Sequence, residues 1–528
     1  MKSVVFFKGR RLSVSMIGLA LCLSATICNG QNKKNASPKD GRSVVILYES
    51  DVHCAIDGYA KVAGLRDAIR DTADVLIVSS GDFVQGSMAG AVSRGQYIID
   101  VMNAVGYDVI TLGNHEFDYM VPRLLELTSQ LKAITVCSNF FDAKSGKTVY
   151  APYVVKKAGR WKVAFVGAVA PSTMNTERFA FYTDGGEQLY TLKPDQVYAL
   201  VQKAVDQARK EGADFVVVLS HLGEDKTDED VDSHGLAAST RDIDVILDAH
   251  THNLHLADTV FNLDGKPVTI SQTGYEFANV GKLLIVKDGK MSFSMIPVPS
   301  IGTSSKEVER ATEKVKQQME LVTNRVVCRS DYSLKVLDDA GEYLVRYSET
   351  NAGDLVADAF RHSTGAEVAF TNAGGIRNEV AAGDLTYGDF VKLLPYDNLL
   401  TVVEARGSTI VEMLRRTTAK MSYDNGDFPQ CSGIRYTIHT GVHDVTDVEV
   451  LNAGGEYEPI DLERTYKLAT IDYCVSGGGF AGAFVDCNVV TKTNIHYRDA
   501  AMDYVREAMN GVIDIRYAKP QGRITVLE

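Results

Sequence analysis

Five short runs rich in β-branched residues each end in a polar motif, and this pattern constrains the fold more than any other feature. Runs of this kind are typical of buried strands. Segments with helical periodicity lie between them, and in the segment 196–211 apolar residues fall on one stripe. The alternation predicts an α/β region from residue 43 to about 300, whose runs are 44–53, 74–82, 108–118, 214–221 and 244–252.

The polar residues at the ends of these runs are predicted to form one site, because open α/β sheets place their sites at the carboxyl ends of the strands. One such residue alone is commonly a cap or a solvated loop residue, but five successive strand ends argue for a shared function. The residues are Asp51, His53, Asp82, Asn114, His115, His221, His250 and His252.

The predicted site has the donor atoms of a metal centre. Oxygen and imidazole ligands without a thiolate suit zinc, manganese or iron. The candidates are too numerous for one ion, and two ions that share a carboxylate fit them better. Cys54 adjoins His53, but neighbouring residues of a strand point to opposite faces, so it is not expected to be a ligand. The remaining histidines fit no motif: His234, His255, His362, His439, His443 and His496.

Length and charge limit the class of protein. A chain of 528 residues is expected to form more than one domain. The formal net charge of −13 argues against nonspecific binding to nucleic acid, which requires a basic surface. After the first 30 residues, no stretch is apolar enough to suggest a transmembrane segment.

The first 30 residues have the pattern of an export signal. Lys2, Lys8, Arg10 and Arg11 precede a mostly apolar stretch, and cleavage after Gly30 is predicted. The protein is therefore expected to be exported, as a periplasmic or secreted protein. Lipid attachment at Cys28 is a lesser alternative, since the residues before it form a poor lipidation motif.

The cysteines do not suggest a structural metal site. Six remain after the signal segment, and none has the C-x-x-C spacing of a zinc knuckle. Export permits disulfides, but their pairing cannot be read from one sequence. Buried free thiols are expected in a chain of this size.

The sequence divides into two domains joined by a helix. Residues 43–300 form the first domain, 301–329 the linker, and 330–528 the second domain. In the linker, Ser304 and Glu307 have capping-box spacing and predict a helix over 305–323. The second domain has strand-like runs of its own at 367–372, 399–405 and 466–473.

The motifs DVH, GDFVQG, GNHEFD, SHLG and AHTH, in this order, closely resemble those of the calcineurin-like metallophosphatases. More specifically, residues 43–528 resemble the 5′-nucleotidase family. The resemblance implies an α/β protein: an N-terminal sandwich of two sheets flanked by helices, a linker helix, and a C-terminal α/β domain that supplies the substrate pocket. It also implies an enzyme that uses two divalent ions, zinc or manganese.

The resemblance assigns a role to each residue of the predicted metal site. One ion would be held by Asp51, His53, Asp82 and His252, and the other by Asp82, Asn114, His221 and His250. His115 would be the catalytic histidine, oriented by Asp118. Two cations would lower the pKa of a bound water and produce a nucleophile near neutral pH.

The second domain contains motifs that resemble the family's nucleotide pocket. NAGGIR, residues 372–377, resembles a glycine-rich turn, which lets the backbone approach a ligand closely. The resemblance implies nucleotide contacts from Arg346, Asn372, Gly375 and Arg377. It also implies that the base stacks between Phe428 and Tyr473.

One departure from the family affects the substrate. The family has GGDG after the second aromatic residue, and its aspartate binds the ribose hydroxyls, whereas this chain has Gly479 there. The expected reaction is hydrolysis of nucleoside 5′-monophosphates to nucleoside and phosphate. The alternatives are a UDP-sugar hydrolase, a 2′,3′-cyclic nucleotide phosphodiesterase, a thiosulfate-ester hydrolase and a non-catalytic nucleotide-binding protein.

Overall fold

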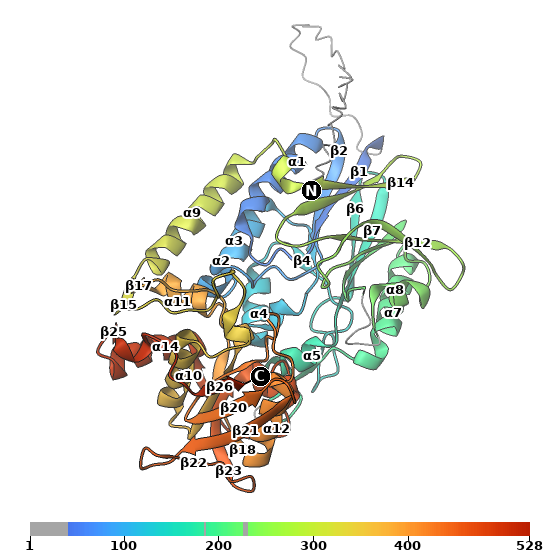
Figure 1. Cartoon of the computed structure of the whole chain (residues 1–528). Helices are drawn as coiled ribbons and strands as arrows, with labels where there is room; N and C mark the ends of the chain where they lie inside the picture. Colours follow the sequence, from blue (N-terminus) through green and yellow to red (C-terminus); the bar gives the residue numbers. More distant parts are fainter. Residues whose placement is uncertain (1–40, 184–185, 225–230, 528) are drawn as a thin grey trace, which may run out of the picture. The chain divides into compact units, whose positions relative to one another are not determined.

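The computed structural model describes residues 41–183, 186–224 and 231–527 (Figure 1). The predicted signal peptide, residues 1–30, and the alternative lipid site at Cys28 lie outside the described residues. None of the described helices is both long and apolar enough to cross a membrane. The six described cysteines are free thiols; five are buried and Cys487 is half-buried, as the sequence suggested.

The first sheet of the N-terminal half has six strands. Its central strands β1 and β2 run parallel, and β1 pairs with β13 in antiparallel register. Helices α1 (Tyr59–Ile69), α3 (Gln96–Val105) and α4 (Met120–Gln130) contribute to the core on its outer face. The order is β14 (Met291–Pro297), β13 (Asn279–Ile285), β1 (Ser43–Glu49), β2 (Ala73–Ser79), β3 (Val109–Ile110) and β4 (Ile134–Thr135).

The second sheet also has six strands. Helices α7 (Val197–Lys210) and α8 (Ser233–Ala238) share a core with its outer face. The order is β11 (Leu254–Phe261), β12 (Pro267–Thr273), β10 (Val245–Leu247), β9 (Phe215–His221), β7 (Trp161–Val169) and β6 (Tyr153–Ala158).

The two sheets pack face to face, and alternation along β1 shows how. Val44 and Ile46 lie in the core between the sheets, together with Phe165 of the second sheet. Val45 and Leu47 point to the opposite face and pack in the core that contains α1 and α3. Because both faces of β1 are buried, the strand is an unbroken apolar run, which is the pattern expected for a covered sheet.

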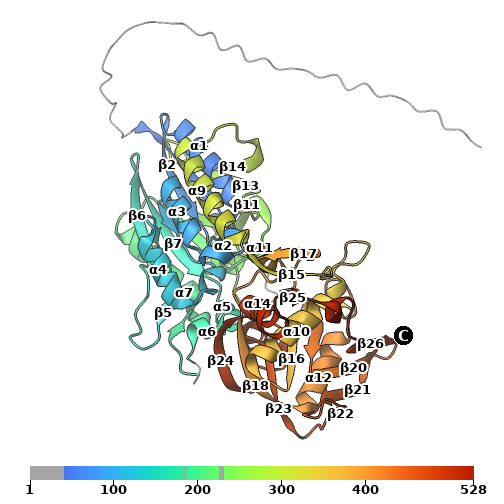
Figure 2. The ribbon, with the colours of Figure 1, turned by 90° about the vertical axis from the view of Figure 1, so that its left-hand side faces the viewer.

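Helix α9 (Lys306–Thr323) follows the first half and contacts α1, α3 and α11 (Tyr387–Leu393) (Figure 2). Val308 and Val315 are buried on its inner face. The helix was predicted correctly, but its cap was not. Ser305, rather than Ser304, is the N-cap residue, and its side chain makes no capping hydrogen bond.

The C-terminal half is built on a five-stranded sheet in the order β19 (Pro429–Ser432), β16 (Val368–Asn372), β23 (Thr465–Ile471), β18 (Leu399–Arg406) and β24 (Asn488–His496). A four-stranded sheet has the order β22 (Tyr457–Pro459), β21 (Asp444–Leu451), β20 (Ile434–His439) and β26 (Ile524–Leu527). The helices that complete this core are α10 (Asn351–Thr364), α12 (Gly407–Thr418) and α14 (Tyr497–Ala508).

One strand of this half ends earlier than predicted. The apolar run 466–473 was interpreted as a strand to its end, but β23 stops at Ile471 and α13 (Asp472–Ser476) begins. Tyr473 therefore lies on a short helix. The fold class is otherwise as expected: a helix-flanked two-sheet sandwich followed by an α/β half.

Short elements complete the described fold. Strands β5 (Phe141–Asp142) and β8 (Tyr190–Thr191) pair with each other. A three-stranded sheet has the order β17 (Gly383–Thr386), β15 (Val326–Ser330) and β25 (Val512–Ile513). The remaining short helices near the site are α2 (Met88–Ser93), α5 (Thr173–Thr176) and α6 (Arg178–Phe181).

Candidate active site

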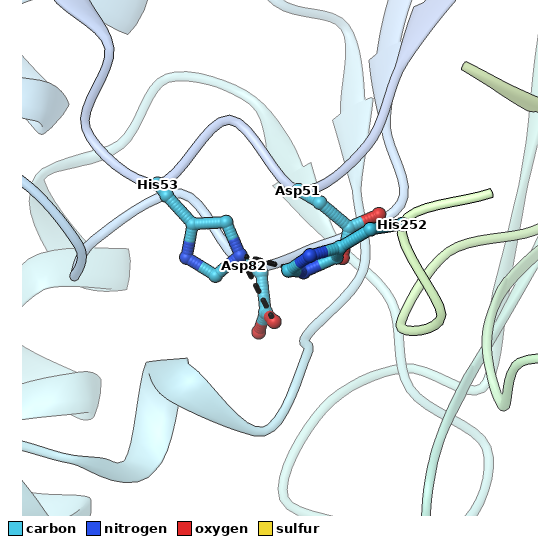
Figure 3. Close-up of side chains that lie close together, drawn as sticks. All are labelled: Asp51, His53, Asp82 and His252. Atoms are coloured by element: carbon cyan, nitrogen blue, oxygen red, sulfur yellow. Dashed lines mark hydrogen bonds and ion pairs between the residues drawn. The ribbon is translucent and has the colours of Figure 1, made fainter. Parts of the chain in front are cut away.

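The predicted ligands converge where the strands of both sheets end. β1, β2 and β3 of the first sheet and β9 and β10 of the second deliver them. Four of these residues each offer a ligand atom, and the four atoms lie within 4.8 Å of one another (Figure 3): Asp51, His53, Asp82 and His252. The two imidazoles meet directly, with His53 Nε2 3.0 Å from His252 Nε2.

The other three ligands form a second group that meets the first at Asp82 and at Asp51, whose Oδ1 accepts from the backbone N–H of His250 at 3.0 Å. Asn114 Oδ1 lies 2.9 Å from His250 Nδ1 and 3.2 Å from His221 Nε2. His221 Nε2 is also 3.1 Å from Asp82 Oδ2, and Asp82 Oδ2 is 3.9 Å from His53 Nε2. Asp82 is thus the carboxylate placed to be shared between two ions.

Hydrogen bonds from the outer ring nitrogens orient two of the histidines. His221 Nδ1 lies 2.8 Å from the carbonyl oxygen of Ser80, and His53 Nδ1 lies 3.2 Å from that of Gln85. A carbonyl oxygen can only accept, so each Nδ1 carries the proton. Each Nε2 then faces the cluster, which is the arrangement of metal-binding histidines.

The backbone at the site adopts a conformation that most residues avoid. Five of the seven ligands have positive φ angles: Asp51 52°, His53 47°, Asp82 57°, His250 78° and His252 58°. Left-handed backbone in residues other than glycine costs about 1–3 kcal/mol each and concentrates at functional sites. Close packing adds a further constraint, since a Cβ at Gly113 would lie 2.1 Å from Asp82 Oδ1.

The charge state of the isolated side chains fits divalent ions. Burial raises the pKa of Asp51 to about 7, and Asp51 Oδ2 is buried without a hydrogen-bond partner in the described part of the chain. Burial lowers the pKa of His53 and of His250 to about 4, so both rings are neutral at pH 7. Burial alone would lower the pKa of His221, but Asp82 and Asp51 raise it to about 10, so this ring carries a proton that a metal ion would displace. A buried carboxylate oxygen beside two neutral imidazoles is destabilising unless a cation binds there. The residues present therefore fit two divalent cations.

Glu116 positions this site, and the sequence analysis did not assign it a role. Its buried carboxylate accepts hydrogen bonds from the backbone N–H groups of Asp82 (2.8 Å), Phe83 (2.8 Å) and Gly113 (2.6 Å). It thereby joins the loop after β2 to the loop after β3. The available signal was its place inside GNHEFD, between His115 and Asp118.

His115 lies beside the metal ligands and is held at two points. Its Nδ1 is 3.0 Å from Asp118 Oδ2, and its backbone N–H donates to Asp82 Oδ1 at 2.9 Å. Burial alone would lower the pKa of His115, but the carboxylates of Asp118 and Asp82 raise it well above its usual range. The protonated ring is a hydrogen-bond donor for negative charge.

A cavity of about 380 Å³ begins at His115 and Asp118 and extends to the C-terminal half. Three of the predicted substrate residues besides Gly375 line it: Asn372, Arg377 and Tyr473. Both halves contribute to its wall, and Ser476 Oγ donates to the carbonyl oxygen of Thr176 at 3.2 Å beside it. Sequence reasoning missed four acidic residues of the wall: Glu177, Asp397, Asp427 and Asp472.

Two predicted substrate residues lie elsewhere. Phe428 is fully buried in the C-terminal core and does not line the cavity, so its ring has no face available to a base in this structure. Arg346 packs its guanidinium over the Tyr343 ring, 4.2 Å from the centroid, and also lies outside the cavity wall. Arg377 approaches the same ring at 5.4 Å, so the two arginines are neighbours.

The surroundings of Gly479 leave little room for a side chain unless Cys474 shifts. A Cβ at Gly479 would lie 2.9 Å from Cys474 Sγ. Asp427 instead brings a carboxylate to this place, because its Oδ1 accepts from the backbone N–H of Phe480 at 3.0 Å.

Comparisons with known proteins agree with this geometry. Residues 44–254 match the calcineurin-like phosphoesterase family, and residues 333–486 match the 5′-nucleotidase C-terminal domain. Protein UshA of Escherichia coli is 23% identical over 518 residues, which cover 87% of this chain and 90% of that protein. The trifunctional nucleotide phosphoesterase YfkN of Bacillus subtilis is 25% identical over 500 residues, which cover 85% of this chain and 33% of that protein.

A solved structure shows the same two-part arrangement. The 5′-nucleotidase precursor of Thermus thermophilus superposes with a TM-score of 0.64 at 25% identity, covering 92% of this chain and 99% of that one. The fold and site thus define a metal-dependent phosphoric ester hydrolase. The chain belongs to the 5′-nucleotidase family, in which a calcineurin-like phosphoesterase domain is followed by the 5′-nucleotidase C-terminal domain.

Proposed function

We propose that this protein hydrolyses nucleoside 5′-monophosphates to nucleoside and phosphate. The observation that carries the proposal is the cavity that runs from His115 to Tyr473. Its volume of about 380 Å³ falls within the range of small-molecule sites. A phosphate would fit the His115 end, where a protonated imidazole can donate to negative charge, and a base would fit the Tyr473 end, where an aromatic ring is available for stacking.

The metal ligands divide as the geometry suggests. Asp51, His53 and His252 would hold one ion, Asn114, His221 and His250 the other, with Asp82 between them. When bound, two such ions supply positive charge for phosphoryl oxygens and lower the pKa of water. We expect zinc or manganese, because the donors are imidazole and carboxylate.

The remaining residues bind and orient the ester. His115 donates a hydrogen bond from Nε2 to the negative charge that develops, while Asp118 accepts from its Nδ1–H and keeps the ring protonated. Arg377 and Asn372 contribute a cation and an amide at the glycine-rich turn that contains Gly375. Tyr473 offers its ring for stacking against a base.

Asp427 is proposed to take over the ribose contact that Gly479 cannot make. Its carboxylate lies beside the Gly479–Phe480 peptide and lines the cavity together with Tyr473. A carboxylate accepts hydrogen bonds from both hydroxyls of a vicinal diol. With Gly479 in place of the family's aspartate, the carboxylate that accepts from the ribose hydroxyls would come from Asp427 on another loop, and ribose binding would be kept.

Phosphate release from AMP tests the proposal most directly. Purified protein is assayed after chelation and again after zinc or manganese is restored, with UDP-glucose and 2′,3′-cyclic AMP in parallel. Metal-dependent release from AMP is the expected result. Turnover of UDP-glucose or 2′,3′-cyclic AMP but not AMP would assign a different substrate. No turnover of any of the three would favour a thiosulfate-ester hydrolase or a non-catalytic binding protein.

Export is proposed on the sequence pattern of residues 1–30, a basic start followed by an apolar stretch. Mass spectrometry of the protein isolated from its native cell tests this. An N-terminus at Gln31 is expected; an intact Met1 would contradict export by cleavage, and a lipid-modified Cys28 would identify the lipid-anchored alternative.

A further inference from the structure

A second cluster of metal-binding side chains lies outside the residues assigned to catalysis. Glu224 lies three residues beyond His221, at the start of the connection from β9 to α8, and His255 and Asp258 belong to β11. Each of the three offers a ligand atom, and these atoms lie within 4.8 Å of one another. His255 Nε2 is 2.8 Å from Glu224 Oε2, and its Nδ1 is 3.4 Å from Asp258 Oδ2.

A β-bulge brings His255 and Asp258 together. Residues three apart on a regular strand point to opposite faces. The pairing of β11 with β12 shifts register between His255 and Asp258, so β11 carries extra residues at this point. A bulge of this kind redirects side chains, and here it leaves His255 between Asp258 and Glu224, with ligand atoms of all three within 4.8 Å of one another.

The Glu224 carboxylate is incompletely satisfied. Its side chain is only 8% exposed, yet Oε1 is buried with no hydrogen-bond partner among the residues that the structure describes. Within the described ranges, neither Glu224 nor Asp258 forms an ion pair with a lysine or an arginine. A buried carboxylate oxygen without a donor is destabilising. Two carboxylates around one imidazole leave negative charge for a cation to neutralise.

We propose that Glu224, His255 and Asp258 bind a third divalent ion, of the zinc or manganese class, that is separate from the catalytic pair. One imidazole and two carboxylates are suitable ligands for such an ion. The ion would connect the segment after β9 to β11. Because His221 ends β9, and His250 and His252 precede β11, the site would stabilise the two segments that carry three catalytic ligands.

Metal counting on the whole protein tests this inference independently of turnover. Wild-type protein and the variants His255→Ala, Asp258→Asn and Glu224→Gln are equilibrated with zinc, freed of unbound metal, and analysed by inductively coupled plasma mass spectrometry. His362→Ala is the matched control, since His362 pairs with Glu507 on the surface at 3.6 Å without a third ligand.

Three ions per wild-type chain, two per chain in His255→Ala and Asp258→Asn, and three in the control are expected. Glu224→Gln keeps the shape of the side chain and should also bind two ions per chain. Because this variant should fold normally, its lower metal content could not be attributed to loss of folding. Thermal unfolding with and without zinc gives a second readout, and the stabilisation by zinc should be smaller in all three variants.

Two ions in the wild type, or an unchanged count in His255→Ala and Asp258→Asn, would overturn the proposal. This inference rests on the proposed function only where it calls the other two ions catalytic. If the protein binds three ions but hydrolyses no nucleotide, this inference holds and the nucleotidase proposal fails. If it hydrolyses AMP but binds only two ions, the nucleotidase proposal holds and this inference fails.

Discussion

His115 Nδ1 lies 3.0 Å from Asp118 Oδ2, so the ring that faces the cavity is oriented by a carboxylate three residues further along the chain. The contact also raises the pKa of His115, against the effect of burial. Asp118 lines the cavity as well but is directed at the imidazole. We therefore expect the pair to act as a unit, with His115 toward the substrate and Asp118 as the positioning residue.

His115→Ala should lower kcat by about 10²–10⁴-fold, the range for loss of a positioned proton donor. Its metal content should equal that of the wild type, because His115 is not among the proposed ligands. Steady-state kinetics with AMP and metal analysis check this. His362→Ala, a surface histidine, is the control. Unchanged kcat in His115→Ala would refute the assigned role.

Asp118→Asn should reduce kcat as well, by a smaller factor, because the amide can still contact the ring but brings no charge to favour its protonated form. KM for AMP should change little. The measurement is a kcat and KM comparison of the two variants and their double variant. If the two residues act as a unit, the double variant will be no slower than His115→Ala alone.

His252→Ala should remove one ion and leave the other. The imidazole of His252 is 42% exposed and contacts His53 and Asp51, whereas the other group is assembled around Asn114. Metal analysis should show one ion fewer than in the wild type, and turnover should recover partly at high added manganese. Loss of both catalytic ions would show that His252 supports the whole cluster.

Tyr473→Ala should raise KM for AMP by about 5–150-fold, since stacking on a base contributes about 1–3 kcal/mol. Phe428→Ala should act differently in this structure. It removes a fully buried ring from the core and should lower the free energy of unfolding by about 3–5 kcal/mol. A large rise in KM for Phe428→Ala at full stability would show that its ring reaches the base in another conformation.

Asp427→Asn should weaken discrimination by the ribose. The wild type should prefer AMP over 2′-deoxy-AMP in kcat/KM, and the variant should lose most of that preference while its kcat for the deoxy substrate stays the same. The reason is that a carboxylate accepts more strongly from hydroxyl groups than an amide does. An equal loss on both substrates would instead assign Asp427 to holding the Phe480 backbone N–H.

Asp354 should make stability depend on pH. Burial raises the pKa of Asp354 to about 8, from about 3.9 in an unfolded chain. The folded protein then holds a proton that the unfolded chain releases, so this contribution is present below pH about 4 and is lost as the pH rises toward 8.

Asp354→Asn keeps a neutral side chain at every pH. Between pH 5 and pH 8, the free energy of unfolding of the wild type should fall relative to that of the variant by about 3–4 kcal/mol, given a maximum slope of about 1.4 kcal/mol per pH unit. Denaturant titrations at both pH values measure it. A constant difference would show that Arg523, 3.6 Å away, keeps Asp354 ionised.

Much of the fold could be predicted because its signals are local. The runs that became β1, β2, β9 and β10 are apolar on both faces, and the stripe of α7 has the helical period. The error at Tyr473 has a local cause too, since nothing in an apolar run shows where a strand gives way to a helix. Ser304 and Ser305 are adjacent serines, and only the chain path selects the second as N-cap.

The sequence by itself determined the chemistry of the site: it shows which carboxylates, imidazoles and amide follow the strands, and it therefore predicts a metal site. Their kinds and order depend on short-range spacing, which one chain displays in full. Only the tertiary structure decided which residues share a space. It placed Asp427 beside Gly479, kept Phe428 in the core, and brought Glu224 to His255 across two connections. Such contacts depend on how separate elements pack. The number of residues between two positions in the sequence does not show whether their side chains meet in the fold.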